Sequence, residues 1–254
     1  MKSIKKDSLG DRMKKFYESR TKIKLIRRTP VIIRIDGKAF HTLTREFEKP
    51  FDPVMVKAMQ DTMKYLCENI QGCVLGYTQS DEITLVLVDY NKLETDAWFD
   101  YDVQKLCSVS ASMATFAFNR NFTKIAMLNS IDRKDYTNAY SILSHRGAMF
   151  DARCFNVPVE EVTNCIFWRQ QDATRNSIQA VGRAYFSHKE LQGLNTDQIQ
   201  ELLFSKQGVN WNDFPTHLKR GSCCIKKESG WCIDNEIPIF KEDSREYIEK
   251  LINY

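Results

Sequence analysis

Three acidic residues stand at the ends of two apolar segments, a placement typical of metal-dependent chemistry. Asp36 follows the β-branched run at residues 31–35, and Asp81 and Glu82 directly precede the apolar run at residues 83–88. Clustered carboxylates repel one another unless cations neutralise them, and Mg²⁺ accepts a few carboxylates while leaving room for phosphate oxygens. Two Mg²⁺ ions held roughly 3.5 to 4 Å apart are the usual apparatus of phosphoryl and nucleotidyl transfer. We therefore expect a catalytic role for these acids.

The glycine after Asp36 indicates how a triphosphate would be held. Because it lacks a Cβ, Gly37 would let its carbonyl group and the next N–H groups approach a metal-bound triphosphate. Those N–H groups belong to Lys38, Ala39, Phe40 and His41. Lys49 could reach the same phosphates as a point charge. An Asp-Gly pair alone is usually a turn, so the conjunction with the second acidic segment is what favours a site.

The elements that must position these residues follow a ferredoxin-like order. A strand at residues 31–35 is followed by a helix that Asp52 caps and Pro53 begins, with apolar residues spaced by three and four up to Gly72. The next elements are a hairpin of strands at 73–78 and 83–88, a helix at 103–119 and a strand at 150–157. Strand, helix, strand, strand, helix, strand is the ferredoxin-like pattern.

This topology predicts where the acids meet. A right-handed crossover makes the first two strands parallel, so the third strand runs antiparallel beside the first. The start of the third strand then meets the end of the first. We therefore expect Asp81 and Glu82 to lie beside Asp36 at one edge of the sheet.

The rest of the chain predicts helices and one hairpin. Helices are expected at residues 160–186, 196–206 and 244–252, and a hairpin at 222–233. No repeat or low-complexity linker marks a boundary. We predict an α+β fold: an antiparallel sheet with flanking helices in residues 1–158, and a C-terminal helical and hairpin elaboration in residues 159–254 packed on it as one continuous domain.

Composition describes an ordinary globular chain. Its 254 residues include 37 Lys and Arg, 33 Asp and Glu, and 43% hydrophobic residues, which excludes disorder. No apolar run approaches the roughly 18 residues of a membrane helix, and no apolar block follows the basic start. We expect a cytoplasmic location and no membrane partner. The eight cysteines show no CxxC spacing, so we expect reduced thiols and no zinc site.

Charge is unevenly distributed along the chain. Residues 1–28 hold eleven Lys and Arg against three acids, whereas residues 81–102 hold seven acids against one Lys. A basic N-terminal arm suits a polyanionic partner, and an acidic cluster suits divalent cations. A solvated basic helix explains the arm equally well.

Seven segments in chain order resemble the motifs of the tRNA-His guanylyltransferase family. They are Arg34-Ile-Asp-Gly-Lys-Ala-Phe-His41, Lys49-Pro50, Tyr77-Thr-Gln-Ser-Asp-Glu82, Phe150-Asp-Ala-Arg153, Trp168-Arg-Gln-Gln-Asp172, Leu191-Gln-Gly193 and Lys219-Arg-Gly-Ser222. The resemblance spans about residues 10–225. It implies a polymerase-palm-like enzyme that extends RNA in the 3′–5′ direction, usually as a homotetramer.

In that family a tRNA 5′-monophosphate is activated with ATP, or a 5′-triphosphate is used directly, and the 3′-hydroxyl of an incoming nucleotide attacks the activated phosphate. The resemblance implies that Asp36 and Asp81 hold two Mg²⁺ ions, that the Gly37 carbonyl completes one site and that Glu82 is a supporting acid. For GTP or another nucleotide it implies contacts from Asp36, Gly37, Lys38, Ala39, Phe40, His41, Lys49, Ser80, Asp81 and Lys105. For tRNA the candidates are Arg169, Gln170, Arg175, Asn176, Lys219 and Arg220.

One departure from the family pattern bears on specificity. After Trp168-Arg-Gln-Gln-Asp172, eukaryotic members carry a His-Ile-Asn-Asn stretch, whereas this chain has Thr174-Arg-Asn-Ser177. The sequence thus resembles the guanylyltransferase-like branch, which repairs 5′-truncated tRNAs by copying the opposite strand. Arg175 and the basic arm would suit contacts with the backbones of varied tRNAs, because phosphate contacts do not read sequence.

Three alternatives stay open. One is a guanylyltransferase specific for tRNA-His, and a second is a palm-fold nucleotide cyclase that needs no RNA. The third is a non-catalytic RNA-binding module, which stacks bases on aromatic residues of its first and third strands. Residues 31–35 and 83–88 contain no aromatic residue, which argues against the third.

Overall fold

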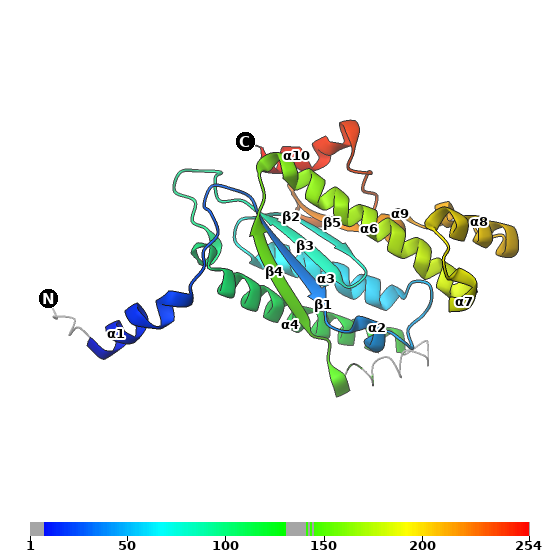
Figure 1. The fold of residues 1–254 in the computed structure, drawn as a ribbon, viewed down its shortest axis with the longest axis horizontal. Helices are drawn as coiled ribbons and strands as arrows, with labels where there is room; N and C mark the ends of the chain where they lie inside the picture. Colours follow the sequence, from blue (N-terminus) through cyan, green and yellow to red (C-terminus); the bar gives the residue numbers. More distant parts are fainter. Residues whose placement is uncertain (1–7, 131–140, 142, 144, 254) are drawn as a thin grey trace.

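The structure, a computed structural model, describes residues 8–130, 141, 143 and 145–253. A six-stranded sheet with antiparallel neighbours runs through it in the order β4-β1-β3-β2-β5-β6 (Figure 1). The strands are β1 Val31–Gly37, β2 Cys73–Gln79, β3 Glu82–Leu87, β4 Phe150–Asn156, β5 Ser222–Lys227 and β6 Gly230–Asp234. The order β4-β1-β3-β2 is the ferredoxin-like arrangement, so the predicted α+β, palm-like fold is confirmed.

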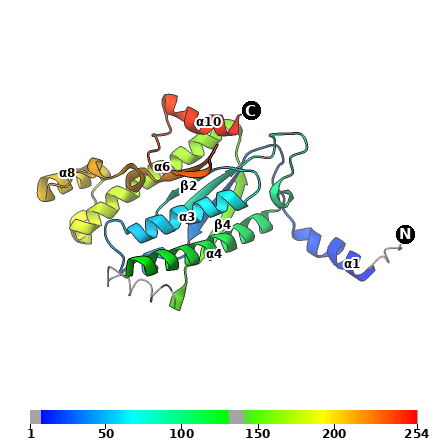
Figure 2. The same cartoon turned by 180° about the vertical axis from the view of Figure 1, so that it is seen from behind.

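Two long helices cover one face of the sheet, and another lies on the opposite face. Figure 2 shows α3 and α4 in front of the sheet, whereas α6 lies on the side that faces the viewer in Figure 1. The helices are α1 Ser8–Phe16, α2 Phe40–Leu43, α3 Pro53–Asn69, α4 Val103–Ser130, α6 Val159–Tyr185, α7 His188–Leu191, α8 Thr196–Gln207, α9 Thr216–Arg220 and α10 Glu246–Ile252. The 3₁₀ helices are η1 Glu18–Thr21, η2 Trp98–Tyr101, η3 Trp211–Asp213 and η4 Glu242–Arg245.

The alternation of β1 explains why the sheet has two cores. Ile33 and Ile35 belong to the core beneath α3 and α4, whereas Ile32 belongs to the core beneath α6 and α10. Because successive side chains of a strand point to opposite faces, Arg34 and Asp36 share the α6 face with Ile32. The apolar strand thereby carries two charged side chains onto one face.

Two predicted elements differ from the structure. The helix expected at residues 103–119 continues as α4 to Ser130, because Phe122 and Ala126 extend its buried stripe. The hairpin expected at residues 222–233 does not merely pack on the sheet: β5 pairs with β2, with Gly76 opposite Cys224, and extends the sheet beyond the ferredoxin-like strands. The division of the chain at residue 158 stays a prediction.

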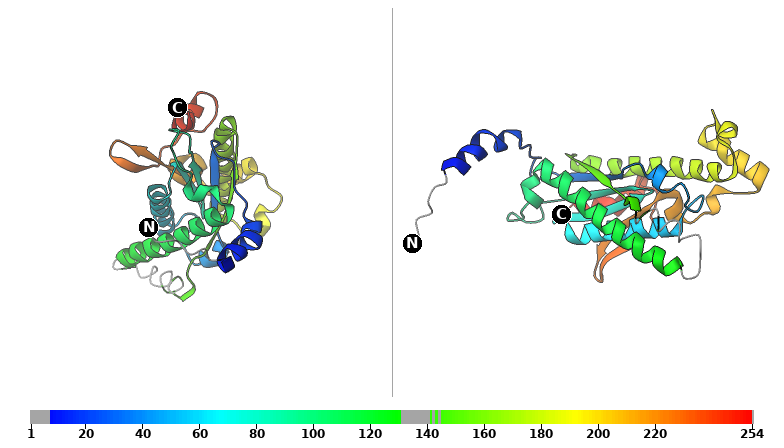
Figure 3. Two further views of the ribbon diagram at one scale, coloured as in Figure 1. Left: turned by 90° about the vertical axis from the view of Figure 1, so that its left-hand side faces the viewer. Right: turned by 90° about the horizontal axis from the view of Figure 1, so that it is seen from below.

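The N-terminal helix α1 stands apart from the body of the molecule (Figures 1 and 3). The segment after it is anchored, since Arg27 forms an ion pair with the buried Asp89 at 2.6 Å. Residues 1–7 of the predicted basic arm lie outside the described residues. In the part of the chain that the structure describes, no helix has the length and apolar character needed to cross a membrane. All eight cysteines lie in that part and are free thiols, as predicted.

Candidate active site

The three acids meet at one edge of the sheet, as predicted. Asp36 lies opposite Glu82 in the register of β1 and β3, and the Gly37 N–H donates to the Asp81 carbonyl oxygen at 3.1 Å. Asp36 is also opposite Asp151 on β4. Antiparallel pairing of β1 and β3 therefore joins residues 45 positions apart in the chain into one acidic site.

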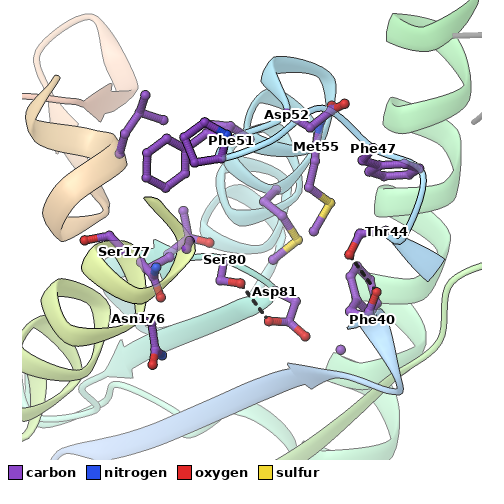
Figure 4. Close-up of a pocket in the computed structure, with 18 of the residues that line it drawn as sticks. Phe40, Thr44, Phe47, Phe51, Asp52, Met55, Ser80, Asp81, Asn176 and Ser177 are labelled. Atoms are coloured by element: carbon purple, nitrogen blue, oxygen red, sulfur yellow. Dashed lines mark hydrogen bonds between the residues drawn. The ribbon is translucent and has the colours of Figure 1, made fainter. Parts of the chain in front are cut away.

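Asp81 sits in an unfavourable electrostatic environment. Burial raises the pKa of Asp81, and the negative charges of Asp36 and Glu82 raise it further. Ser80 partly opposes this effect, because its hydroxyl donates to Asp81 Oδ1 at 3.0 Å (Figure 4). A carboxylate in such surroundings gains from a nearby cation.

Glu82 is held differently from the two aspartates. Its carboxylate accepts two hydrogen bonds from the Arg169 guanidinium, Nε to Oε1 at 2.6 Å and Nη2 to Oε2 at 2.9 Å. Arg169 also contacts Asp172 at 2.5 Å. This bidentate pairing orients the Glu82 carboxylate beside the two aspartates, and its predicted catalytic role as a supporting acid stays a prediction.

A cavity of about 540 Å³ opens beside the two aspartates. Its walls come from the β1–α2 turn, the first half of α3, the β2–β3 turn and the second half of α6 (Figure 4). Eight of the ten predicted nucleotide-binding residues line it: Asp36, Gly37, Ala39, Phe40, His41, Lys49, Ser80 and Asp81. The volume lies within the range of small-molecule sites.

Lys38 and Lys105 are the two predicted residues that the structure leaves out of the cavity. The Lys38 N–H donates to the Met149 carbonyl at 2.8 Å, so it is used within the fold. Lys105 lies in the first turn of α4, where its backbone N–H donates to the Asp102 carboxylate. The ammonium group of Lys105 lies 5.4 Å from the centre of the Phe99 ring. Within one chain, neither contributes to the cavity.

Lys49 lines the cavity from its exposed rim. Its Nζ donates to the Thr44 carbonyl at 2.9 Å, a bond within the loop that joins α2 and α3. Ala39, directly before α2, adopts a left-handed conformation with φ of 55°. The loop thereby presents the backbone of Ala39, Phe40 and His41 and the charge of Lys49 to the same space.

The predicted tRNA contacts divide into buried and accessible residues. Gln170 is 2% exposed, and its amide bonds the Pro238 carbonyl and the Phe240 N–H. Lys219 is 8% exposed and donates to the Asn212 carbonyl. These two side chains make hydrogen bonds inside the protein, and their contact with tRNA stays a prediction.

Three of the other candidates stay accessible. Arg175 contacts Asp172 and keeps about half of its side chain exposed, at 53%. Asn176 lines the cavity, and Arg220 is partly exposed at the end of α9. Arg169, the remaining candidate, is committed to Glu82 as described above.

Arg183, Gln60 and His217 are among the polar residues of the cavity wall that sequence reasoning missed. Arg183 follows Asn176 at seven positions on α6, so helical periodicity could have found it. Gln60 donates to Ser222 Oγ and Asn235 Oδ1 at 2.8 Å, and those partners lie over 160 residues away. Burial lowers the pKa of His217, which favours its neutral form. No local pattern marks Gln60 or His217.

The donor set fits a metal that also binds its substrate. Among the described residues no group of three or more His, Cys, Asp and Glu side chains could hold a metal ion. Two carboxylates and a glycine carbonyl suit Mg²⁺, which commonly uses one or two carboxylates together with water and substrate phosphates. Closed sites made of protein ligands alone are typical of structural zinc instead.

A palm-like sheet with two carboxylates at the head of a nucleotide-sized cavity defines a class of nucleotidyl-transferring proteins, and the comparisons identify the family. The family described as tRNAHis guanylyltransferase (Thg1) matches residues 10–158. The chain belongs to this family and is a nucleotidyltransferase.

Solved structures agree over almost the whole chain. A bacterial tRNA(His) guanylyltransferase (Thg1)-like protein in complex with ATP is 46% identical, has a TM-score of 0.85 and covers 97% of this chain and 100% of its own. Another such bacterial protein, in complex with GTP, is 41% identical, with a TM-score of 0.78 and coverage of 98% and 100%. The tRNA(His) guanylyltransferase of Schizosaccharomyces pombe is 28% identical over 217 residues, 80% of this chain and 76% of the relative.

Proposed function

We propose that this protein adds nucleotides to the 5′ end of truncated tRNAs, in the 3′–5′ direction, by copying the opposite strand. The observation that carries the proposal is the position of Asp36 and Asp81 at the head of a cavity of about 540 Å³, in a chain of the tRNAHis guanylyltransferase family. Addition at a 5′ end needs a nucleotide site next to open protein surface. The cavity opens at the sheet edge and meets this requirement.

The nucleotide occupies the cavity in our proposal. The bacterial neighbours bound to ATP and to GTP support both nucleotides as substrates, ATP to activate a 5′-monophosphate and GTP or another nucleoside triphosphate for addition. We place the triphosphate against the segment from Ala39 to His41 and against Lys49, because these residues line the cavity. Lys49 acts there as a point charge and takes no part in bond formation.

Mg²⁺ fits the acidic site, and we propose that Asp36, Asp81 and the Gly37 carbonyl hold two such ions. When bound, the ions supply charge neutralisation at the phosphates and polarise the attacking and leaving oxygens. The protein's own contribution is to fix the two carboxylates by strand pairing and the Ser80 hydroxyl. Glu82 and Arg169 keep the start of β3 in place beside them.

The departure from the His-Ile-Asn-Asn pattern begins at Thr174, which takes the place of the histidine and is not among the residues that line the cavity. Asn176 keeps the asparagine of the pattern, and Ser177 is the changed residue that lines the cavity. The loss of the histidine supports selection of the nucleotide by base pairing with the template and not by one tRNA identity.

For the RNA we propose contacts from Arg175, Asn176 and Arg220 and from the basic helix α1. Such contacts hold the phosphate backbone without reading sequence, as repair of several tRNAs requires. A basic helix that stands apart from the body of the molecule suits a long partner such as tRNA.

We further propose that the protein is a homotetramer and that it is located in the cytoplasm. Light scattering of the purified protein measures the number of subunits.

One incubation separates the candidate functions. The protein is incubated with labelled nucleoside triphosphate and Mg²⁺ in three reactions. The first contains no RNA, the second contains a 5′-truncated tRNA, and the third contains a tRNA-His that lacks only its extra 5′ guanosine. Extension of truncated tRNA supports the proposal. A cyclic product formed without RNA would indicate a cyclase. RNA binding without extension would indicate a binding module. Addition to tRNA-His alone would indicate a guanylyltransferase specific for that tRNA.

A further inference from the structure

Trp168 is the exposed tryptophan of this protein. The chain has four tryptophans, all described by the structure, and Trp98 and Trp211 are buried at 8% and 6% exposure. Trp231 packs against the core, but Trp168 on α6 is 46% exposed. Exposure of so large an apolar ring is unfavourable in water, so a ring that the fold leaves there suggests a ligand.

Two arginines from different elements, Arg34 of β1 and Arg169 of α6, lie close to the ring. The guanidinium carbon of Arg169 lies 4.5 Å from the ring centre, and Arg169 is itself fixed by Glu82 and Asp172. The guanidinium carbon of Arg34 lies 5.5 Å from the same centre. A cation near an aromatic ring is attractive and orders the side chain. Trp168 is therefore pre-organised and not a loose surface residue.

The position of Trp168 relates directly to the acidic site. Arg34 and Asp36 share one face of β1, two residues apart, which is roughly 7 Å along a strand. Because Arg34 lies beside the Trp168 ring, the ring lies on the face of the sheet that also carries Asp36. In Figure 1 no helix lies in front of β4 or the middle of β1 on this side.

An ordered indole ring that stays 46% exposed beside two arginines has the chemistry that binds a nucleobase. Aromatic side chains stack on unpaired or terminal bases, and the interaction tolerates any base because every base has a π face. Guanidinium groups nearby add attraction for the RNA backbone. The two guanidinium groups favour an anionic ligand such as RNA over a neutral saccharide or an apolar peptide.

We propose that Trp168 is a stacking platform for the terminal base of the RNA, the base next to the position being filled. This inference rests on the proposed function, because it assigns part of the RNA to a place on the protein. The platform positions the 5′ end over β1 and so sets its distance from Asp36 and Asp81. It reads no sequence, which suits repair of several tRNAs.

The test compares Trp168→Ala, Trp168→Leu and Trp168→Phe with the wild type. The probe is a tRNA acceptor stem that lacks its first 5′ nucleotide and carries fluorescent 2-aminopurine at the new 5′ end. We expect the Ala and Leu variants to raise the Kd for this RNA about ten- to a hundredfold and to lose the fluorescence quenching by stacking, since one stacked base contributes that much. The Phe variant should retain most of the RNA affinity and most of the quenching. In all three variants the Kd for GTP and the melting temperature should change little.

Phe116→Ala is the matched control, because Phe116 is 56% exposed beside Arg120 on α4, on the opposite side of the sheet. It should bind the RNA as the wild type does. The inference is overturned if Trp168→Leu matches the wild type in RNA affinity and quenching while the wild type still extends the RNA, and the proposed function then stands. If the wild type binds no truncated tRNA at all, both fall.

Discussion

Asp36 and Asp81 reach the site by different routes, and the difference sets what each change should do. Asp36 is the penultimate residue of a strand whose partners on both sides fix its backbone. Asp81 is in the β2–β3 turn, where burial and two neighbouring acids raise its pKa. The fold therefore holds both carboxylates close together although their charges oppose it, as expected for residues retained for chemistry.

Replacing either aspartate by asparagine should abolish activity without unfolding the protein. Asp36→Asn and Asp81→Asn keep the shape of the side chain but remove the charge that we propose to bind Mg²⁺. We expect nucleotide addition to fall by about a thousandfold or more, since transition-state charge stabilisation by a metal contributes several kcal/mol. Single-turnover rates measure the loss, and circular dichroism measures the fold. Asp197→Asn, on the exposed first turn of α8, is the control and should keep full activity.

The raised pKa of Asp81 predicts a pH-dependent gain in stability. In metal-free buffer at pH 7, burial and the two neighbouring acids disfavour the charged form of Asp81 in the folded state. Asp81→Asn removes this charge and should therefore raise the melting temperature. We expect roughly 2–4 °C, the shift that about 1 kcal/mol gives at this chain length. The gain should shrink as the pH falls through the raised pKa and vanish below about 3.9, the ordinary value for Asp. A gain that is equal at pH 7 and pH 3.5 would rule out this cause.

Lys49→Ala should separate nucleotide use from RNA binding. The side chain reaches the cavity rim, and its described bond is to the loop carbonyl of Thr44. We expect KM for the nucleoside triphosphate to rise about tenfold, as loss of one exposed charge contact of about 1.4 kcal/mol gives. The Kd for tRNA should stay within a factor of two. An equal loss of tRNA affinity would mean that Lys49 contacts the RNA.

At the scale of elements, the β1–α2 turn couples the core to the site. A Cβ on Gly37 would lie 2.3 Å from Cδ2 of Phe40, the first residue of α2. The Phe40 ring cannot move aside freely, because it packs against Phe118 at 5.4 Å and Phe150 at 5.1 Å between ring centres. The glycine thus lets α2 and its backbone N–H groups sit close to Asp36.

Gly37→Ala should therefore damage stability and activity together. Overpacking of this kind costs about 1–3 kcal/mol, and α2 must shift away from the cavity. We expect a lower melting temperature and a rate of nucleotide addition reduced by about tenfold or more, since small displacements of a positioned group are expensive. Phe40→Leu in the same chain should recover part of the loss. If Gly37→Ala keeps the wild-type rate, the close approach has no functional role.

The elements that position the acids were predictable because each has a local pattern. Residues 31–35 are β-branched and lead into Asp36, and Asp52 with Pro53 marks the start of α3, where the Asp52 carboxylate accepts from the Met55 N–H. Strand order then followed from the handedness of the crossover. The adjacency of Asp36 and Glu82 needed no further information.

The remaining features depend on contacts between distant parts of the chain. The pairing of Glu82 with Arg169 joins residues 87 positions apart, and it places a predicted tRNA contact beside the acidic site. Gln170 and Lys219 belong to segments that resemble family motifs, but both side chains are buried. The spacing of residues within one helix does not reveal this burial. Lys105 is on the first turn of a helix whose start lies away from the cavity. Tertiary contacts, not local sequence, decide these roles.

At the scale of the whole molecule, the site lies where one sheet, three helices and an open strand face meet. The cavity lies between α3 and α6, and the face of β1 and β4 that no helix covers in Figure 1 leads away from it (Figures 1 and 4). In our proposal the nucleotide occupies the cavity and the RNA lies along that face, with the two carboxylates between them. Pairing with the template then selects the nucleotide, so no side chain needs to read its base.

Template-directed addition is the central claim, and one measurement tests it most directly. The first 5′ nucleotide is deleted from several tRNAs, the base opposite the gap is changed to each of the four bases, and the added nucleotide is identified by sequencing the products. We expect the nucleotide complementary to the opposite base to be added in every tRNA tested. Addition of guanosine whatever the opposite base, or extension of tRNA-His alone, would contradict repair and make the protein a guanylyltransferase of fixed specificity.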